Sequence, residues 1–154
     1  YKAFAPGPPG TATDRLVSFV DFAPTLLALA GVPVPDAVQG RPFLGPDARP
    51  RGYVFAARDR MDERPDHQRA VRDERFKYVR NYLPHRPYAP RLDYMELLPT
   101  MKEFRRLAAA GELTGPAADF VRPTKPAEEL YDTAADPHEV ANLAADPAHR
   151  PTLD

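Results

Sequence analysis

The sequence has no cysteine and no marked excess of either charge sign. Without cysteine the chain forms neither disulfide bonds nor thiolate metal sites, and cysteine usage gives no indication of its redox compartment. Its 21 basic and 22 acidic residues leave a formal net charge of -1. This balance lacks the positive surface that nucleic acids and anionic membranes attract, so we expect neither as a partner.

Long hydrophobic runs are also missing. The longest candidate, residues 19–34, is interrupted by Asp21, Pro24, Gly31 and Pro33, whereas a membrane span needs roughly 18–20 uninterrupted apolar residues. The chain opens on Tyr1 rather than on a methionine, so we expect its true N-terminus to lie upstream. The compartment therefore stays open among periplasmic, secreted and cytoplasmic locations.

Proline is what the chain has in abundance, with 20 among its 154 residues, about 2.5 times ordinary usage. The prolines are spread out and often flank apolar runs, which predicts short elements joined by many connectors. Hydrophobic residues make up 43% of the chain, so its composition is not that of a disordered protein. The length suffices for one domain with a modest core.

Residues 17–30 predict a short extended stretch that runs into a helix. Ser18 and Asp21 have the spacing of a capping pair, which places Asp21 at the helix start. Pro24 is compatible with a first helical turn, and Gly31 is expected to end the helix. Apolar residues at helical spacing form one face that we expect to pack in a core. They are Phe22, Leu26, Leu27 and Ala30.

Short apolar and alternating segments predict strands. Residues 53–57 are a strand-type run, and residues 70–73 and 76–82 predict an antiparallel pair around a turn at 73–75. Residues 129–132 predict one further brief strand. Two or three strands need a partner layer, so this small antiparallel sheet is expected to pack with helices.

Helical patterns return in the second half of the chain. Apolar spacing predicts a helix over 96–110, with Pro99 near its start and Gly111 ending it. A short helix is expected over 116–121 and a turn of helix over 137–144, with Asp132 and Asp136 starting turns.

Five motifs together carry a family resemblance. The outer two are residues 17–27 (Val-Ser-Phe-Val-Asp-Phe-Ala-Pro-Thr-Leu-Leu) and residues 126–144, which contain Glu-Glu-Leu-Tyr-Asp and Asp-Pro-His-Glu. Between them lie residues 58–63 (Arg-Asp-Arg-Met-Asp-Glu), the paired segments 69–72 and 76–82, and residues 84–88 (Pro-His-Arg-Pro-Tyr). In this order and separation they resemble the C-terminal portion of the sulfatase family, closest to its bacterial sulfamidase or heparan-type branch. No single motif is decisive, but their common order argues against chance.

The resemblance implies an alkaline-phosphatase-like α/β fold, which would read as α+β in an isolated fragment. Family members carry a divalent metal, usually Ca2+, and a formylglycine that attacks sulfur, both in their N-terminal portion. The Cys/Ser-x-Pro-x-Arg motif and the paired aspartates of that site are absent here. Residues 1–10 resemble the stretch just after the last metal ligands. The resemblance thus implies that this fragment has no catalytic residue and no metal ligand, and is inactive alone.

The same resemblance predicts the organisation and the parent activity. Residues 1–50 would be the end of the catalytic α/β domain with a connector, and residues 51–154 a C-terminal sulfatase subdomain containing the small antiparallel sheet. The intact parent would be a sulfuric ester hydrolase that cleaves sulfate esters or N-sulfates, on a sulfated sugar or other small molecule. The missing N-terminal catalytic portion would be its structural partner.

A charged segment, residues 58–63, follows the strand expected at 53–57. Ligands of α/β sheets bind at the carboxyl ends of strands. The forked guanidinium groups of Arg58 and Arg60 suit a sulfate or carboxylate, and Asp59 and Asp62 suit sugar hydroxyls. The alternative interpretation is a solvated charge run that bridges two strands.

Two histidines complete the candidate substrate-binding set. His67 stands beside Asp66, and His85 lies within residues 81–88, whose aromatic side chains could form a rim of the substrate pocket. The alternatives are an exposed loop histidine and structural packing. The four histidines are isolated from one another, and no set of His, Asp and Glu has the spacing of a metal site.

Two rival hypotheses stay open. One is a stand-alone binding module that uses residues 58–63 and 81–88 without catalysis. The other keeps the superfamily but makes the parent a phosphatase or phosphodiesterase. A segment of a larger fold should leave Phe4, Val17, Phe19 and one sheet face exposed, whereas a true module should cover them.

Overall fold

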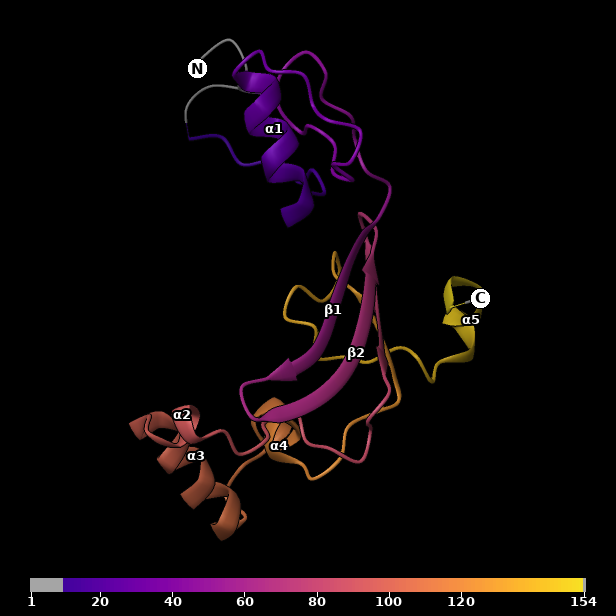
Figure 1. Cartoon of the computed structure of the whole chain (residues 1–154). Coiled ribbons are helices and arrows are strands. Elements are labelled where there is room, and N and C mark those ends of the chain that lie inside the picture. The colour runs from indigo at the N-terminus through magenta and orange to yellow at the C-terminus, as the bar shows by residue number, and fades with distance from the viewer. Residues whose placement is uncertain (1–9, 154) are drawn as a thin grey trace. The chain divides into compact units, whose positions relative to one another are not determined.

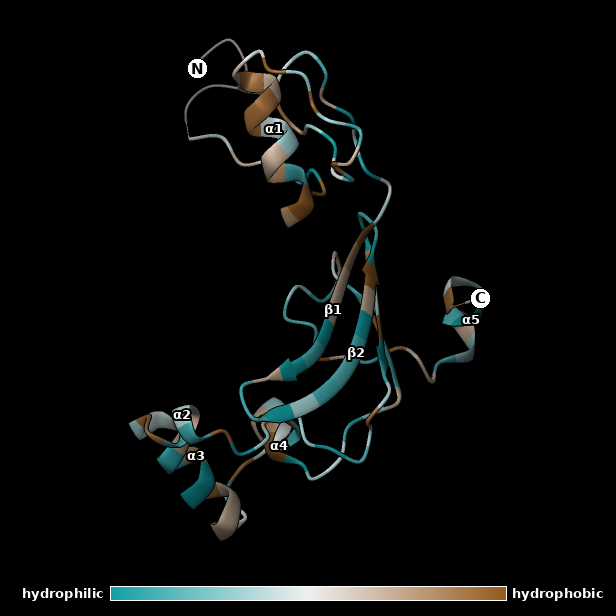
Figure 2. Ribbon diagram, viewed as in Figure 1, coloured by the Kyte–Doolittle hydropathy of each residue, from teal (hydrophilic) through white to brown (hydrophobic). Residues whose placement is uncertain are grey.

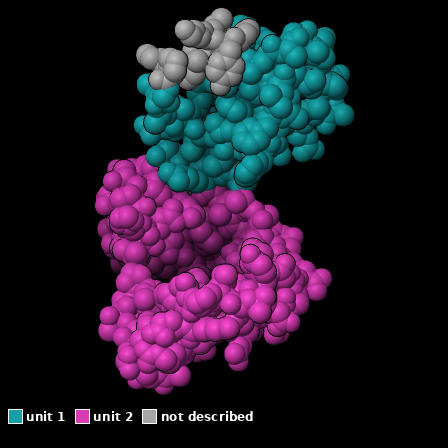
Figure 3. Space-filling view, turned by 90° about the vertical axis from the view of Figure 1, so that its left-hand side faces the viewer, with its two compact units in different colours: residues 1–55, 72–74 teal, residues 56–71, 75–154 magenta. Residues whose placement is uncertain are grey.

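A computed structural model describes residues 10–153 (Figure 1). The chain forms two compact units, one of Tyr1–Phe55 with Arg72–Glu74 and one of Ala56–Val71 with Arg75–Asp154 (Figure 3). The assignment of residues 1–50 to a catalytic domain and 51–154 to a subdomain stays a prediction. The expectations for residues 1–9, Phe4 among them, lie outside the described residues.

The first unit contains a 3-10 turn, η2 (Phe19–Asp21), that runs directly into helix α1 (Phe22–Leu29). The expected helix is confirmed, with Pro24 in its first turn. The extended stretch ends at Ser18, whose backbone N–H donates to the Asp21 carboxylate at 3.1 Å. Asp21 therefore stands at the helix start as predicted.

The expected core face of α1 was wrong in part. Pro24 and Thr25 are buried, but Phe22 and Leu26 are exposed. The reason is that the loop of residues 40–43 packs on the Asp21 and Thr25 side of the helix. There the Arg41 backbone N–H donates to Asp21 at 3.0 Å, and the Phe43 backbone N–H donates to the Thr25 hydroxyl at 3.1 Å.

The second unit is built on a four-stranded sheet in the order β1-β2-β3-β4. Its strands are β1 (Val54–Met61), β2 (Arg64–Arg72), β3 (Phe76–Asn81) and β4 (Glu128–Asp132). Short turns join β1 to β2 and β2 to β3, so these neighbours run antiparallel. β4 pairs antiparallel with β3, with Tyr78 opposite Leu130. The predicted turn at 73–75 and the predicted strand near 129–132 are confirmed.

In the second half of the chain, prolines lie at the starts of two helices, α3 (Pro99–Ala110) and α4 (Gly115–Val121). The helix expected over 96–110 is confirmed as α3, which begins at Pro99 as predicted, and a separate short helix, α2 (Asp93–Glu96), precedes it. Gly111 ends α3 in the left-handed conformation at a φ of 69°. The short helix is α4, and the described chain ends with η3 (Pro147–His149) and α5 (Arg150–Leu153).

Residues 137–144 form turns, so the helical turn expected there was wrong. Asp136 accepts hydrogen bonds from the backbone N–H groups of Val140 and Ala141 at 2.7 and 2.8 Å. Asp132 accepts from Ala134 and Ala135 in the same way, both at 3.2 Å. Side-chain acceptors thus take the place of a helical ladder, as expected for aspartates that start turns.

The interior of the described chain is more polar than apolar. Its buried apolar side chains are Pro24, Ala89, Leu92, Met101 and Leu130, whereas its buried polar ones are Asp21, Thr25, Asp66, Asn81, Lys125, Glu129 and Asp132. Hydrophobic residues gather along α1, while the turn end of the β1–β2 hairpin is mostly hydrophilic (Figure 2). Such an interior depends on hydrogen bonds as much as on apolar packing.

Candidate functional site

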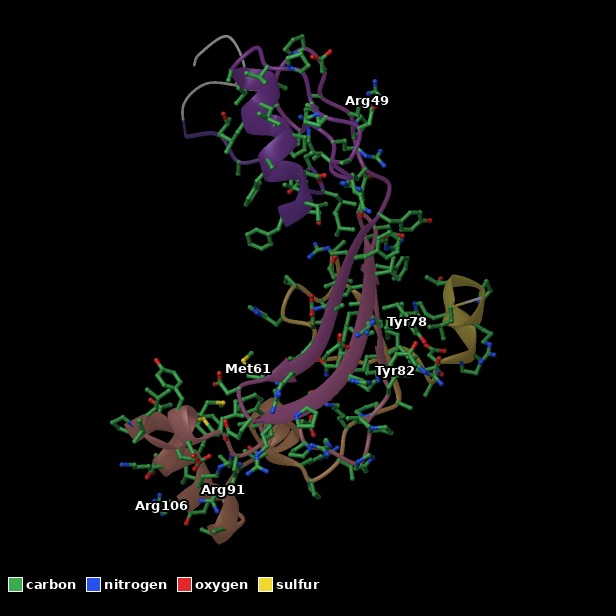
Figure 4. All side chains as sticks on the ribbon, in the orientation of Figure 1. Arg49, Met61, Tyr78, Tyr82, Arg91 and Arg106 are labelled. Atoms are coloured by element: carbon green, nitrogen blue, oxygen red, sulfur yellow. The ribbon has the colours of Figure 1, made fainter. Side chains whose placement is uncertain are left out.

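The charged segment expected beyond a strand lies largely inside one. β1 continues to Met61, which Figure 4 labels at its end, so Arg58, Asp59 and Arg60 are strand residues. The expected position beyond a strand's carboxyl end was therefore wrong. β1 is an edge strand of an antiparallel hairpin, where charged side chains are common. Successive side chains of a strand point to opposite faces, which separates Arg58 from Asp59.

One face of the hairpin carries Asp59, His67 and Arg69, and we call it the outer face. Arg69 forms an ion pair with Asp59 at 2.7 Å, and the His67 Nε2 atom lies 4.0 Å from the same carboxylate. The hydrogen bond from Arg69 lowers the pKa of Asp59. All three side chains are exposed, so this cluster can meet a ligand in solvent.

The opposite face, which we call the inner face, carries Arg58 and Asp66. The Lys125 ammonium reaches both Asp66 oxygens, at 2.6 and 2.7 Å, and both side chains are buried. Arg58 Nε lies 4.0 Å from Asp66, which is too long for a hydrogen bond. Lys125 comes from the segment before β4, so three separate parts of the chain meet here.

A second polar network continues the inner face across the sheet. The Asn81 amide donates to Glu129 and to the Pro126 carbonyl, and accepts from the Gln68 amide at 2.8 Å. The Tyr131 hydroxyl donates to Glu129 at 2.5 Å. Burial, assisted by the Glu129 carboxylate, raises the pKa of Tyr131 and of Tyr88. These phenols stay protonated donors at neutral pH.

The remaining candidates stand apart from both clusters. Arg60 is exposed on β1, and Asp62 is exposed in the β1–β2 turn with a φ of 43°. His85 is exposed in a turn that the Arg86 N–H to Leu83 carbonyl bond closes at 3.1 Å. The structure therefore brings together Asp59 with His67, places Arg58 on the other face, and joins Arg60, Asp62 and His85 to neither cluster.

A cavity of about 580 Å3 opens beside the second network. Its walls come from the loop after β3, from α4, from β4 and from the turns that follow β4. Among its lining residues are Tyr88, Phe120, Lys125, Glu129, Tyr131 and His138. None of the six candidate substrate-binding residues lines it, so it is separate from the surface that the sequence indicates.

Sequence reasoning missed Lys125 and the role of Asp66. The two are 59 residues apart, and nothing in either local pattern links them. Lys125 stands in a proline-containing connector, where a lysine is ordinarily taken as exposed. The pairing of β4 with β3 brings Lys125 to the inner face of the hairpin, next to Asp66. Glu129 lies in the predicted strand of residues 129–132, and its side chain accepts hydrogen bonds from Asn81 and Tyr131.

Within residues 10–153, no group of three His, Asp or Glu side chains is placed to hold a metal ion. The residues described here thus offer no fit for the divalent metal of the sulfatase family. No helix in this part of the chain is both long and apolar enough to cross a membrane.

Comparison with known proteins identifies what this segment resembles. No family model matches the chain. An ulvan-active sulfatase of Formosa agariphila is 46% identical over 144 residues, which covers 93% of this chain and 24% of that protein. The human N-sulphoglucosamine sulphohydrolase is 28% identical and covers 94% of the chain and 31% of that enzyme.

Solved structures agree on the fold. A 2-O GAG sulfatase matches with a TM-score of 0.57 and 23% identity, over 93% of this chain and 24% of its own. A sulfatase in complex with its substrate D-glucosamine-2-N,6-O-disulfate matches with a TM-score of 0.50 and 19% identity, over 86% of this chain and 21% of its own. Both likenesses concern the arrangement of the elements.

The relatives and the structural neighbours belong to one class of proteins, the sulfatases, which are sulfuric ester hydrolases. Within it, the chain corresponds to the C-terminal portion of a sulfatase, which confirms the family resemblance and the mixed α/β fold. The human relative is named as an N-sulphoglucosamine sulphohydrolase, and the sulfamidase or heparan-type branch of this chain stays a prediction. The chain spans only about a quarter of the length of the curated relatives it matches.

Proposed function

We propose that this chain is the C-terminal part of an enzyme that hydrolyses sulfate esters or N-sulfates of a carbohydrate. The observation that carries the proposal is the 46% identity to an ulvan-active sulfatase, sustained over 93% of the chain. The relatives and structural neighbours act on sulfated sugars where their names state a substrate. A sulfated sugar is therefore the substrate class we assign to the whole enzyme.

The nucleophile and the metal would belong to the upstream portion. The chain contains no cysteine that could become formylglycine, and residues 10–153 hold no metal-ligating group of three. When bound, Ca2+ or another divalent ion would stabilise the charge of the transferred sulfuryl group, beside the formylglycine nucleophile. This chain's own residues would bind and orient the sugar.

The β1–β2 hairpin and the loop after β3 are the surfaces we assign to substrate. On the outer face, Asp59 accepts from Arg69 and retains exposed oxygens for sugar hydroxyls, and His67 stands beside it as a second hydrogen-bonding group. Of the two arginines of β1, Arg58 suits an anionic substituent, whereas Arg60 is exposed apart from both clusters and is not assigned to substrate. His85 and Asp62 would contribute at the rim.

The exposed apolar side chains favour a segment of a larger fold over a stand-alone module. In the first unit, Phe19 is 85% exposed and Leu26 is 67% exposed. Phe19 and Phe22 stack edge-on at 5.1 Å, and Phe22 contacts Phe43 at 5.8 Å between ring centres. An exposed aromatic cluster of this kind is typical of a surface that another part of a protein covers. Val17 is half-buried and does not belong to it.

Release of sulfate tests the proposal and separates it from the phosphatase alternative. A form of the protein extended upstream to the length of its relatives would be incubated with O-sulfated sugars, N-sulfated sugars and the corresponding phosphomonoesters. We expect inorganic sulfate from at least one sulfated sugar and no phosphate. Release of phosphate alone would contradict the assignment and support a phosphatase or phosphodiesterase.

A further inference from the structure

Asp66 is a buried carboxylate whose charge is already neutralised. Its two oxygens accept from the Lys125 ammonium at 2.6 and 2.7 Å. The Lys125 side chain is 0% exposed and the Asp66 side chain 3%. A two-oxygen pairing of this kind, shielded from water, forms a complete ion pair that needs no third group.

Arg58 is a second cation beside this completed pair. Its Nε lies 4.0 Å from Asp66, and this buried nitrogen has no hydrogen-bond acceptor among residues 10–153. Arg86 Nε is the other buried side-chain donor that has no acceptor among the described residues. The Nη1 atom of the same guanidinium donates to the Pro65 carbonyl at 3.1 Å. Arg58 and Arg86 therefore each place an unsatisfied Nε atom near the Pro65–Asp66 segment. Buried donors without an acceptor are costly, which indicates that an acceptor is missing at this place.

The charges of the three groups do not balance. Lys125 and Arg58 contribute two positive charges against one negative charge on Asp66. A cation that is partly removed from water is stabilised by an added anion far more than an exposed one is. The Arg58 side chain is 29% exposed, so part of it meets solvent while its Nε is buried. A guanidinium binds planar or tetrahedral oxyanions through two parallel N–H bonds.

We propose that Arg58 is the oxyanion-binding residue of this chain, and that Asp66 and Lys125 are its positioning residues. The ligand is a sulfate or carboxylate group, whose oxygens would accept from the guanidinium that Asp66 leaves unsatisfied. Its assignment to the substrate of the whole enzyme rests on the proposed function. Lys125 acts by keeping Asp66 neutralised, which prevents Asp66 from capturing Arg58.

The neighbouring arginines do not share this arrangement. Arg69 is held by Asp59 at 2.7 Å on the outer face. Arg60 lies on the same strand as Arg58, two residues further on, but is exposed to solvent. An exposed guanidinium in water attracts an anion only weakly. Arg60→Gln is therefore a matched control for Arg58→Gln.

The first measurement is anion binding by the 154-residue chain, followed through the 1H–15N signal of Arg58 Nε. Sodium sulfate, sodium glucuronate, a sulfated monosaccharide and its unsulfated parent would be titrated separately at constant ionic strength. We expect a saturable shift with the three anions and none with the neutral sugar. Arg58→Gln should weaken binding about tenfold or more, since it removes hydrogen bonds to a charged group, and Arg60→Gln less than about twofold. Equal effects of the two substitutions would overturn the proposal.

Substitutions that remove the charges of Lys125 and Asp66 test whether these residues position Arg58. Lys125→Met leaves Asp66 free to pair with Arg58, so anion binding should fall as in Arg58→Gln. The double variant Lys125→Met with Asp66→Asn removes both charges and leaves Arg58 positive, so binding should return to within about threefold of the starting protein. Circular dichroism would confirm that each variant folds. If the double variant binds no better than Lys125→Met, the two residues are merely structural and their proposed role is wrong.

A last comparison distinguishes a failure of the anion site from a failure of the proposed function. In the upstream-extended protein, Arg58→Gln should raise the KM for a sulfated sugar about tenfold or more. Binding that persists in a protein that releases no sulfate would refute the proposed function and leave the anion site standing. Hydrolysis with an unchanged KM in Arg58→Gln would refute the anion site and leave the function standing. A preference for free sulfate over the sulfated monosaccharide would show that the site does not recognise substrate.

Discussion

Asp21 shows how one buried side chain organises a unit of this protein. It accepts from the Ser18 and Arg41 backbones and forms a two-pronged ion pair with Arg51. Its side chain is almost fully buried. The start of α1 and two loops that are 20 and 30 residues away in sequence are thus fixed by one carboxylate. Sequence analysis placed Asp21 at the helix start but could not identify Arg51, because no local pattern joins them.

Acid should destabilise the first unit through Asp21. The Arg51 hydrogen bond, with smaller contributions from the two backbone donors, lowers the pKa of Asp21 from 3.8 to about 2. Since the folded pKa lies below the unfolded one, the stabilisation is complete above about pH 4 and is lost as the pH falls towards 2. It amounts to about 2 kcal/mol. Urea unfolding of the protein and of Asp21→Asn between pH 7 and pH 2 measures it.

The Asp21→Asn variant should be less stable at pH 7 by at least that amount, and the gap should narrow in acid. Asp36→Asn, which changes an exposed carboxylate of the same unit, is the control and should change stability by less than about 0.5 kcal/mol. A gap that stays constant down to pH 2 would show that the Asp21 charge contributes nothing.

At the scale of elements, strand existence could be predicted and strand extent could not. Alternation in residues 76–82 correctly separates Tyr78 and Arg80, which both contact Glu128, from Asn81, which contacts Glu129. The extent of β1 was missed because its charged half is held by pairing with β2, which apolar patterning does not report. For the same reason the two faces of the hairpin, and hence the split of the candidate site, could not be derived from the sequence.

The loop that follows α1 depends on Gly40. A Cβ added there would collide with the carbonyl oxygen of Val20 and lie 2.9 Å from the Pro24 side chain. Backbone cannot move aside as a flexible side chain does, so Gly40→Ala should destabilise the protein by about 1–3 kcal/mol. Gly52→Ala is the matched control, because nothing lies within 4 Å of its added Cβ. A melting temperature that is lower for Gly52→Ala than for Gly40→Ala would contradict this packing.

At the scale of the whole molecule, the exposed apolar surface has a consequence for the isolated chain. We expect concentration-dependent self-association, because Phe19 and Phe22 of the aromatic cluster are exposed, Phe19 to 85%. Sedimentation velocity over a hundredfold concentration range would detect it. Phe19→Ser with Leu26→Ser should shift the chain towards monomer, whereas Val140→Ser, an exposed apolar residue of the other unit, should not. A chain that stays monomeric throughout would favour a stand-alone module.

The family could be inferred at this scale from five ordered motifs, although no single element specified it. The polar inner face could not, since it exists only where β1, β2, β3 and the segment before β4 come together.

The claim that the upstream portion supplies the nucleophile is tested most directly with an aryl sulfate. Its hydrolysis by the 154-residue chain would be compared with that by the upstream-extended form, at equal molar concentration and with Ca2+ supplied. An aryl sulfate needs little recognition of a sugar, so it reports on the reaction centre alone. We expect turnover by the extended form and none by the 154-residue chain. Turnover by the chain itself would contradict the conclusion that its residues bind substrate without supplying the nucleophile.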